Sequence, residues 1–128
     1  MGDSRIDKQV SGIVRKILTR ELKECRALLK ERTVSPHTKD FVNGFTAGIK
    51  KVLKSKMLTN SRLDDMYGRL KIKEGNEYRK RRAKPQELRR LKGELHAVIS
   101  VRDMVIDAMN MSRKLEMQNQ MNEGTLCI

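Results

Sequence analysis

Residues 85–117 of this chain read PQELRRLKGELHAVISVRDMVIDAMNMSRKLEM and form the longest segment with a single repeating pattern. Apolar side chains recur in it at steps of three and four residues, which is the period of one face of an α-helix. Pro85 suits the first position of a helix, because the missing N–H of proline would have no intrahelical partner there. The residues of the apolar face are Leu88, Leu91, Leu95, Val98 and Val105, with Ile99, Ile106 and Met109 beside it. We therefore predict one long helix over 85–117.

Three earlier segments show the same period, and turn residues separate them. Ser35 before Pro36 marks a helix start, because a serine hydroxyl accepts from a free N–H of the first turn. Ser61 marks the next start, and Gly75 marks its end, because glycine readily takes the left-handed conformation that closes helices. The alternation of period two that strands require is missing. The predicted helices cover residues 4–31, 36–57, 61–73 and 85–117.

The expected fold is therefore an all-α, single-domain bundle of about four helices, with long first and last helices. Residues 1–117 form this helical domain, with a basic loop over 74–84 before the last helix. Residues 118–128 are expected to form a flexible tail, since chain ends without an apolar face are seldom held in place. Gly44 and Gly48 lie four residues apart in the second helix, which predicts close packing of a neighbouring backbone.

Positive charge is concentrated in one part of the chain. Lys and Arg number 29 against 16 Asp and Glu, so the formal net charge is +13. Residues 69–92 alone hold eleven basic and three acidic side chains. Such a local excess creates a positive potential that attracts polyanions. The composition excludes a membrane protein, a disulfide scaffold and a collagen-like chain.

The basic segment over 79–92 is the main candidate site. Arginine and lysine neutralise phosphates and release bound counterions, and a neighbouring tyrosine offers a ring for stacking on a base. Cations at the start of a helix oppose its dipole, so an anion is expected to bind there. Four aromatic residues are too few for a base-reading platform, which predicts binding with little sequence specificity. The predicted nucleic-acid-binding residues are Tyr78, Arg79, Lys80, Arg81, Arg82, Lys84, Arg89, Arg90 and Lys92.

The sequence allows two other interpretations of this segment. The charge suits an acidic protein surface as well as DNA or RNA, and a solvated loop explains it without any partner. A second basic surface on the first two helices would lengthen a phosphate track if it lay on the same side of the fold. Its residues are Arg15, Lys16, Arg20, Lys23, Lys50, Lys51, Lys54 and Lys56.

Five of the eight methionines lie in the last quarter of the chain. Methionine adapts to irregular apolar surfaces, so the end of the last helix is expected to dock on a partner or on a second copy. We expect homo-oligomer contacts over residues 98–117. The predicted interface residues are Val105, Met109, Met111, Leu115 and Met117.

No catalytic motif, cofactor signature or metal-ligand spacing is found, so no enzyme, cofactor or metal is predicted. His37 and His96 lie far apart, and His96 is expected to flank the core rather than act as a base. Asp103 and Asp107 lie one helical turn apart but lack a second cluster of ligands.

The two cysteines indicate a reducing compartment, because their spacing fits no disulfide framework. Cys25 is expected to be buried and Cys127 exposed. We therefore expect an intracellular protein, cytoplasmic, or nuclear if the host is eukaryotic.

The sequence predicts a non-enzymatic protein that binds the nucleic-acid phosphate backbone through 79–92 and docks or oligomerises through its last helix. The alternative is a protein–protein interaction factor whose basic surface docks on an acidic face of a nucleic-acid-handling machine. Such a factor would be an assembly subunit or a small viral or phage accessory protein or inhibitor. A third reading is a structural subunit whose charge accompanies packaged nucleic acid, as in a virion.

Overall fold

The computed structural model describes residues 3–55 and 58–126, and every regular element in them is an α-helix. The predicted all-α bundle with long first and last helices is confirmed. In chain order, the helices are α1 (Asp3–Lys30), α2 (Pro36–Leu53), α3 (Asn60–Arg79) and α4 (Pro85–Leu126).

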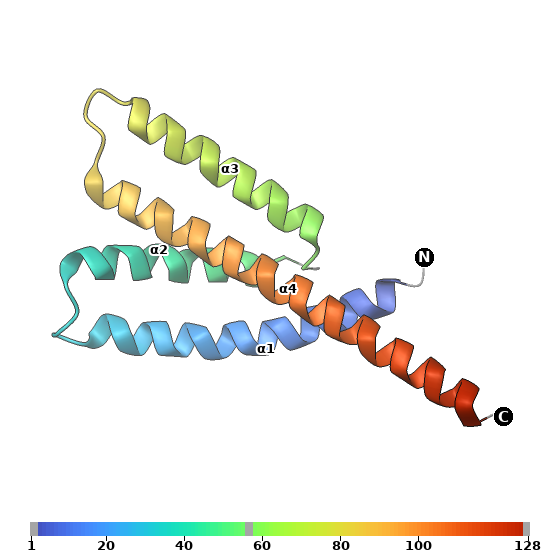
Figure 1. Cartoon of the computed structure of the whole chain (residues 1–128). Helices are drawn as coiled ribbons and strands as arrows, with labels where there is room; N and C mark the ends of the chain where they lie inside the picture. The colour runs from blue at the N-terminus through green and yellow to red at the C-terminus, as the bar shows by residue number, and fades with distance from the viewer. Residues whose placement is uncertain (1–2, 56–57, 127–128) are drawn as a thin grey trace.

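Helix α4 is the central element, and the three other helices all pack against it. α1 and α2 form one antiparallel pair, and α3 runs antiparallel to α4 on the other side (Figure 1). The α1–α2 and α3–α4 turns therefore lie at one end of the bundle. At the other end, the last turns of α4 extend beyond the other helices (Figure 1).

The core is aliphatic and follows one face of each helix. Since an α-helix repeats every 3.6 residues, apolar side chains three or four positions apart point to the same side. Side chains with at most 1% of their surface exposed come from all four helices, and they are Val10, Val14, Leu18, Ile49, Val52, Leu63, Ala97, Val98, Val101 and Val105.

α2 and α4 cross closely at three glycines. A Cβ atom on Gly44 would overlap the main-chain carbonyl of Arg90, and one on Gly93 would overlap that of Phe41. A Cβ atom on Gly48 would lie 2.8 Å from the Cβ of Ala97. The prediction that Gly44 and Gly48 admit a neighbouring backbone is confirmed.

The predicted end of α2 was placed too late. α2 ends at Leu53, and the predicted last residues 56 and 57 lie outside the described residues. The guanidinium of Arg15 donates to the carbonyl oxygens of Leu53 and Ser55. Carbonyls at the end of a helix lack the intrahelical donors of its interior, and here an arginine from α1 supplies hydrogen bonds to them.

The predicted bounds of α3 are wrong at both ends. Thr59 rather than Ser61 is the N-cap, and its hydroxyl accepts a hydrogen bond of 3.3 Å from the N–H of Arg62. At the other end the helix continues through Gly75 to Arg79, and no described glycine has a positive φ. Packing against α4 outweighs the roughly 1 kcal/mol that a mid-helix glycine costs. The connecting loop is therefore 80–84 and not 74–84.

α4 also exceeds its predicted length. Residues 118–126, expected to form a tail, continue the helix. Residues 113–122 contain neither glycine nor proline, and most are straight-chain residues that favour a helix even in solvent. Among the described residues, no helix combines the length and apolar character needed to cross a membrane.

Candidate nucleic-acid interface

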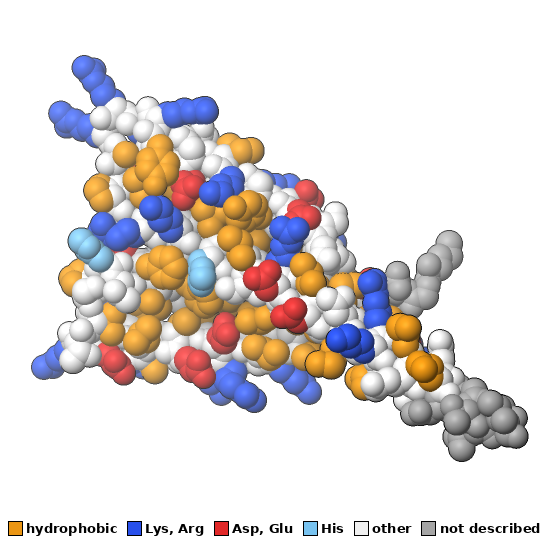
Figure 2. Space-filling view, in the orientation of Figure 1, with side chains coloured by type: hydrophobic (Ala, Val, Ile, Leu, Met, Phe, Trp, Pro, Cys, Tyr) orange, Lys and Arg blue, Asp and Glu red, His pale blue; other side chains and the backbone are white. Residues whose placement is uncertain are grey.

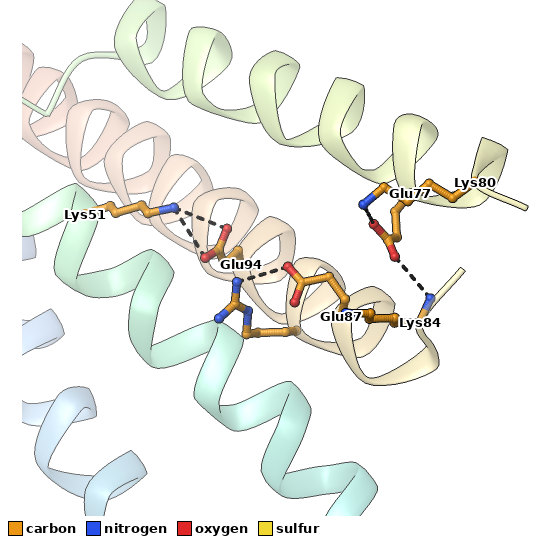
Figure 3. A network of polar contacts seen from close by, with 7 residues as sticks. Lys51, Glu77, Lys80, Lys84, Glu87 and Glu94 are labelled. Atoms are coloured by element: carbon orange, nitrogen blue, oxygen red, sulfur yellow. Dashed lines mark hydrogen bonds and ion pairs between the residues drawn. The ribbon is translucent and has the colours of Figure 1, made fainter. Parts of the chain in front are cut away.

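The basic loop is held by a buried carboxylate that the sequence analysis did not single out. Glu77, in the last turn of α3, has only 5% of its surface exposed. One of its oxygens lies 2.7 Å from the Nζ atom of Lys80, and the other accepts a hydrogen bond of 3.0 Å from the N–H of Lys84 (Figure 3). Because Lys84 directly precedes α4, this contact ties the two ends of the loop together.

The electrostatic effect on both partners is mutual. The hydrogen bond from Lys80, followed by that from the Lys84 backbone, lowers the pKa of Glu77 below its usual range. The same carboxylate raises the pKa of Lys80. Both groups are therefore charged at neutral pH. Their ion pair helps to hold the backbone of the loop that carries Arg81 and Arg82.

The predicted cations divide into two groups. Within the described part of the chain, five of them form no ion pair with a carboxylate, and four of these five are exposed on the turn or at its edges. The five are Arg79, Arg81, Arg82, Lys84 and Lys92. In the space-filling view, Lys and Arg side chains gather over the α3–α4 end of the bundle (Figure 2). Tyr78 lies beside them with 53% of its surface exposed.

The remaining three predicted cations have carboxylate partners in the same chain. Lys80 pairs with Glu77 as described, and the Nη2 atom of Arg90 lies 3.0 Å from Glu87. Arg89 contacts Asp40 of α2 at 2.9 Å and joins α2 to α4. Their charge is partly neutralised within the molecule, so they are weaker candidates for a phosphate than the unpaired group.

The start of α4 already has negative charge close by. Glu77 accepts the N–H of Lys84, and Glu87 lies in the first turn of the helix. Both carboxylates stand where the positive end of the helix dipole favours an anion. The start of α4 therefore has anions of its own, and the exposed unpaired cations of the turn are the stronger candidates for binding a phosphate.

The second predicted basic surface does not extend the turn. α2 starts beside the start of α4, as the Asp40–Arg89 pair shows, so Lys50 and Lys54 lie toward the opposite end of the bundle. Arg15 closes α2, and Lys51 pairs with the buried Glu94 at 3.3 Å (Figure 3). Lys16, Arg20 and Lys23 are exposed on α1, across the bundle from α3. Lys56 lies outside the described residues.

Three cations of α3 were missed by the sequence analysis. Arg62, Arg69 and Lys73 follow one another at intervals of seven and four residues, which places them on one face of the helix. They border hollows between α2 and α3. The spacing itself was the available signal, but the dense run after residue 78 obscured it.

The predicted partner interface is only partly available. Val105 is 1% exposed and belongs to the protein's own core, so its assignment to an interface is wrong. Met109 packs against that core and is half-buried. Met111, Leu115 and Met117 have more than half of their surface exposed on the distal part of α4.

The other titratable candidates do not converge. His37 is exposed near the start of α2. His96 is exposed too and lies at the edge of the core, with its ring 5.7 Å from that of Phe41 and tilted by 52° against it. Asp103 and Asp107 are both exposed on α4. In the described ranges, no three His, Cys, Asp or Glu side chains group to hold a metal ion.

Cys25 is half-buried between α1 and α2 rather than fully buried as expected. Desolvation is the largest cause of its raised pKa. Cys127 lies outside the described residues.

No protein-family model matches this chain, and neither the curated proteins nor the solved structures contain a match to it.

Proposed function

We propose that this protein is a non-enzymatic binding protein that holds the phosphate backbone of a nucleic acid on its α3–α4 turn. The observation that carries the proposal is the group of unpaired cations on a turn whose ends are fixed by Glu77. Arg79, Arg81 and Arg82 are exposed and face solvent together at one end of the bundle.

A fixed turn favours binding because less conformational entropy is lost when the phosphates are contacted. The arginine guanidinium can form two parallel hydrogen bonds with one phosphate. Three exposed arginines on one turn therefore suit a phosphate-rich ligand. Backbone contacts carry no sequence information, so the proposed binding depends strongly on salt and weakly on base sequence.

The exposed apolar end of α4 supplies the second half of the proposal. Met111, Leu115 and Met117 are exposed on the distal part of α4, where Leu115 borders a hollow beside the start of α1 and the last turns extend beyond the other helices (Figure 1). A contiguous exposed apolar patch is typical of an interaction site, and Met111 and Leu115, one helical turn apart, lie on one face of α4. We propose that this segment joins copies of the chain while the opposite end contacts nucleic acid.

Fluorescence anisotropy with a labelled duplex over a salt series tests the binding function. The test variant is Arg79→Ala/Arg81→Ala/Arg82→Ala, and the matched control is Lys16→Ala/Arg20→Ala/Lys23→Ala, which removes the same charge from α1. We expect affinity to fall with salt at about 0.9 logarithmic units per phosphate contact. The turn variant should lose two or three of these contacts, and the control should lose none.

Two results would contradict the proposal. One is an unmodified protein that fails to bind at low salt, which would leave the acidic protein surface and the solvated loop as the remaining interpretations. The other is an equal loss in the turn variant and the control, which would indicate a general charge effect.

A further inference from the structure

A groove between α2 and α3 forms a second candidate site. α2 and α3 both pack on α4, and a groove of about 220 Å³ lies between them. Its lining residues are Lys51, Met66, Arg69, Leu70 and Lys73. A smaller hollow of about 170 Å³ continues it toward the start of α3 and shares Met66 and Arg69 with it, adding Ser55, Arg62 and Asp65.

The groove has charged edges. Arg62, Arg69 and Lys73 are exposed along its α3 side, and within the described residues none of them forms an ion pair. Lys51, on the α2 side, is half exposed while it contacts Glu94 below it. Asp65 is the single carboxylate among the lining residues of the two hollows. The groove therefore has an excess of positive charge.

Its floor is apolar. Leu70 is 5% exposed and belongs to the core, and Met66 beside it is half-buried. An inorganic anion would contact only the cations and would leave the apolar floor exposed to solvent. A ligand that carries phosphates along one edge and flat apolar surface along the other would use both.

The cations also lead toward the α3–α4 turn. At 1.5 Å per residue, Arg62 and Lys73 are separated by about 17 Å along α3. Arg79 follows after a further 9 Å or so on the same estimate, but about 120° around the helix, where it lines a separate hollow with Lys71 and Ile72. A strand bound in the groove would therefore have to cross the surface of α3 to reach Arg79.

We propose that this groove binds single-stranded nucleic acid, with phosphates on Arg69 and Lys73 and an unpaired base over Met66 and Leu70. This inference rests on the proposed function and specifies its ligand. In a duplex the bases are paired and stacked inside, so they cannot reach the floor of the groove. Single strands present both a charged backbone and free base faces, so a groove with cationic edges and an apolar floor can contact both.

The experiment compares a labelled single strand of mixed sequence with the duplex of the same length across a salt series. The variant Arg69→Gln/Lys73→Gln removes two exposed charges and keeps the helix, as circular dichroism should verify. The matched control is Arg20→Gln/Lys23→Gln, another exposed Arg and Lys, on α1. The third protein is the turn variant Arg79→Ala/Arg81→Ala/Arg82→Ala.

We expect the groove variant to bind the single strand about tenfold more weakly and to lose about 1.4 units of salt slope, at 0.7 per phosphate on single strands. Its duplex affinity should stay within twofold of the unmodified protein. The turn variant should weaken both ligands, and the α1 control should weaken neither.

The outcomes separate the two proposals. If the unmodified protein binds neither ligand, the proposed function fails and this inference falls with it. If the turn variant loses affinity but the groove variant binds the single strand normally, only the groove inference is overturned. The groove inference is also overturned if the groove variant loses affinity for the single strand and the duplex equally. It is overturned as well if an acidic peptide of the same charge binds the groove and leaves the affinity for the single strand unchanged.

Discussion

The carboxylate of Glu77 accepts a hydrogen bond of 3.0 Å from the backbone N–H of Lys84, seven residues further along the chain. Its other oxygen contacts the Nζ atom of Lys80 at 2.7 Å. A single buried side chain thus connects the end of α3 to the start of α4. The loop that carries the basic segment gains a fixed shape from an acidic residue.

Replacing Glu77 by glutamine should destabilise the protein at neutral pH and remove part of its acid sensitivity. The folded state lowers the pKa of Glu77, so its contribution is present above the ordinary carboxyl pKa of about 4.3 and is lost as pH falls through the lowered value. The stability gap between the two proteins should therefore close in acid. Urea unfolding between about pH 7 and pH 2 measures it. Parallel curves at all pH values would contradict this assignment.

Lys51 and Glu94 form a pair in which only the acid is buried. The Glu94 side chain is 6% exposed, and Lys51 is its hydrogen-bond partner at 3.3 Å. Lys51→Met leaves the carboxylate unsatisfied, so a loss of about 1–3 kcal/mol in unfolding free energy is expected. Adding Glu94→Gln should recover part of the loss by removing the buried charge. A double-mutant cycle in urea gives the coupling, and strictly additive losses would exclude it.

Gly44 and Gly75 are both mid-helix glycines, but alanine should have opposite effects at the two positions. At Gly44 the new methyl group would overlap the main-chain carbonyl of Arg90. A backbone atom cannot avoid the overlap by a change of rotamer, as a side chain could. Gly44→Ala should cost about 1–3 kcal/mol or more. At Gly75 a Cβ meets no described atom within 4 Å, so Gly75→Ala should gain about 0.5–1 kcal/mol. Thermal or urea unfolding of the two variants tests both signs, and a stable Gly44→Ala protein would refute the close crossing.

Met111 and Met117 are 62% and 63% exposed on the distal part of α4. If this end joins copies of the chain, Met111→Gln/Met117→Gln should lower the mass in solution toward the 14.8 kDa of one chain. Stability should change by less than about 0.5 kcal/mol, because neither side chain lies in the core. Sedimentation equilibrium over a concentration series measures the mass. An unmodified protein that stays monomeric throughout would show that α4 does not mediate self-association.

The periodicity of apolar residues was sufficient to predict four helices, because a core-facing stripe is a local property of the sequence. Ser35 and Pro36 marked the start of α2, and the Ser35 hydroxyl does accept from the N–H of Thr38. Gly44 and Gly48 predicted a close approach, but the partner, α4, became evident only in three dimensions. The buried position of Val105 likewise depends on which side of α4 the other helices cover.

Helix ends were less predictable, since tertiary contacts moved them. α2 ends where Arg15 reaches its last carbonyls from another helix. α3 runs through Gly75 because packing on α4 compensates for the glycine. Neither contact can be inferred from a local pattern, because its two partners are far apart in the chain.

The sequence alone determined the all-α class and the positions of the basic residues, because apolar spacing and composition are local properties that do not depend on contacts between distant residues. The tertiary structure decided which of those charges remain available. Folding brings Asp40 to Arg89 and turns Glu77 toward Lys80 and Lys84, so part of the basic segment is neutralised internally. It also sets Arg69 and Lys73 across from Lys51, and so makes a cationic groove from residues that are far apart in the chain. Pairing and burial depend on distances between helices, and those distances are fixed only when the helices pack.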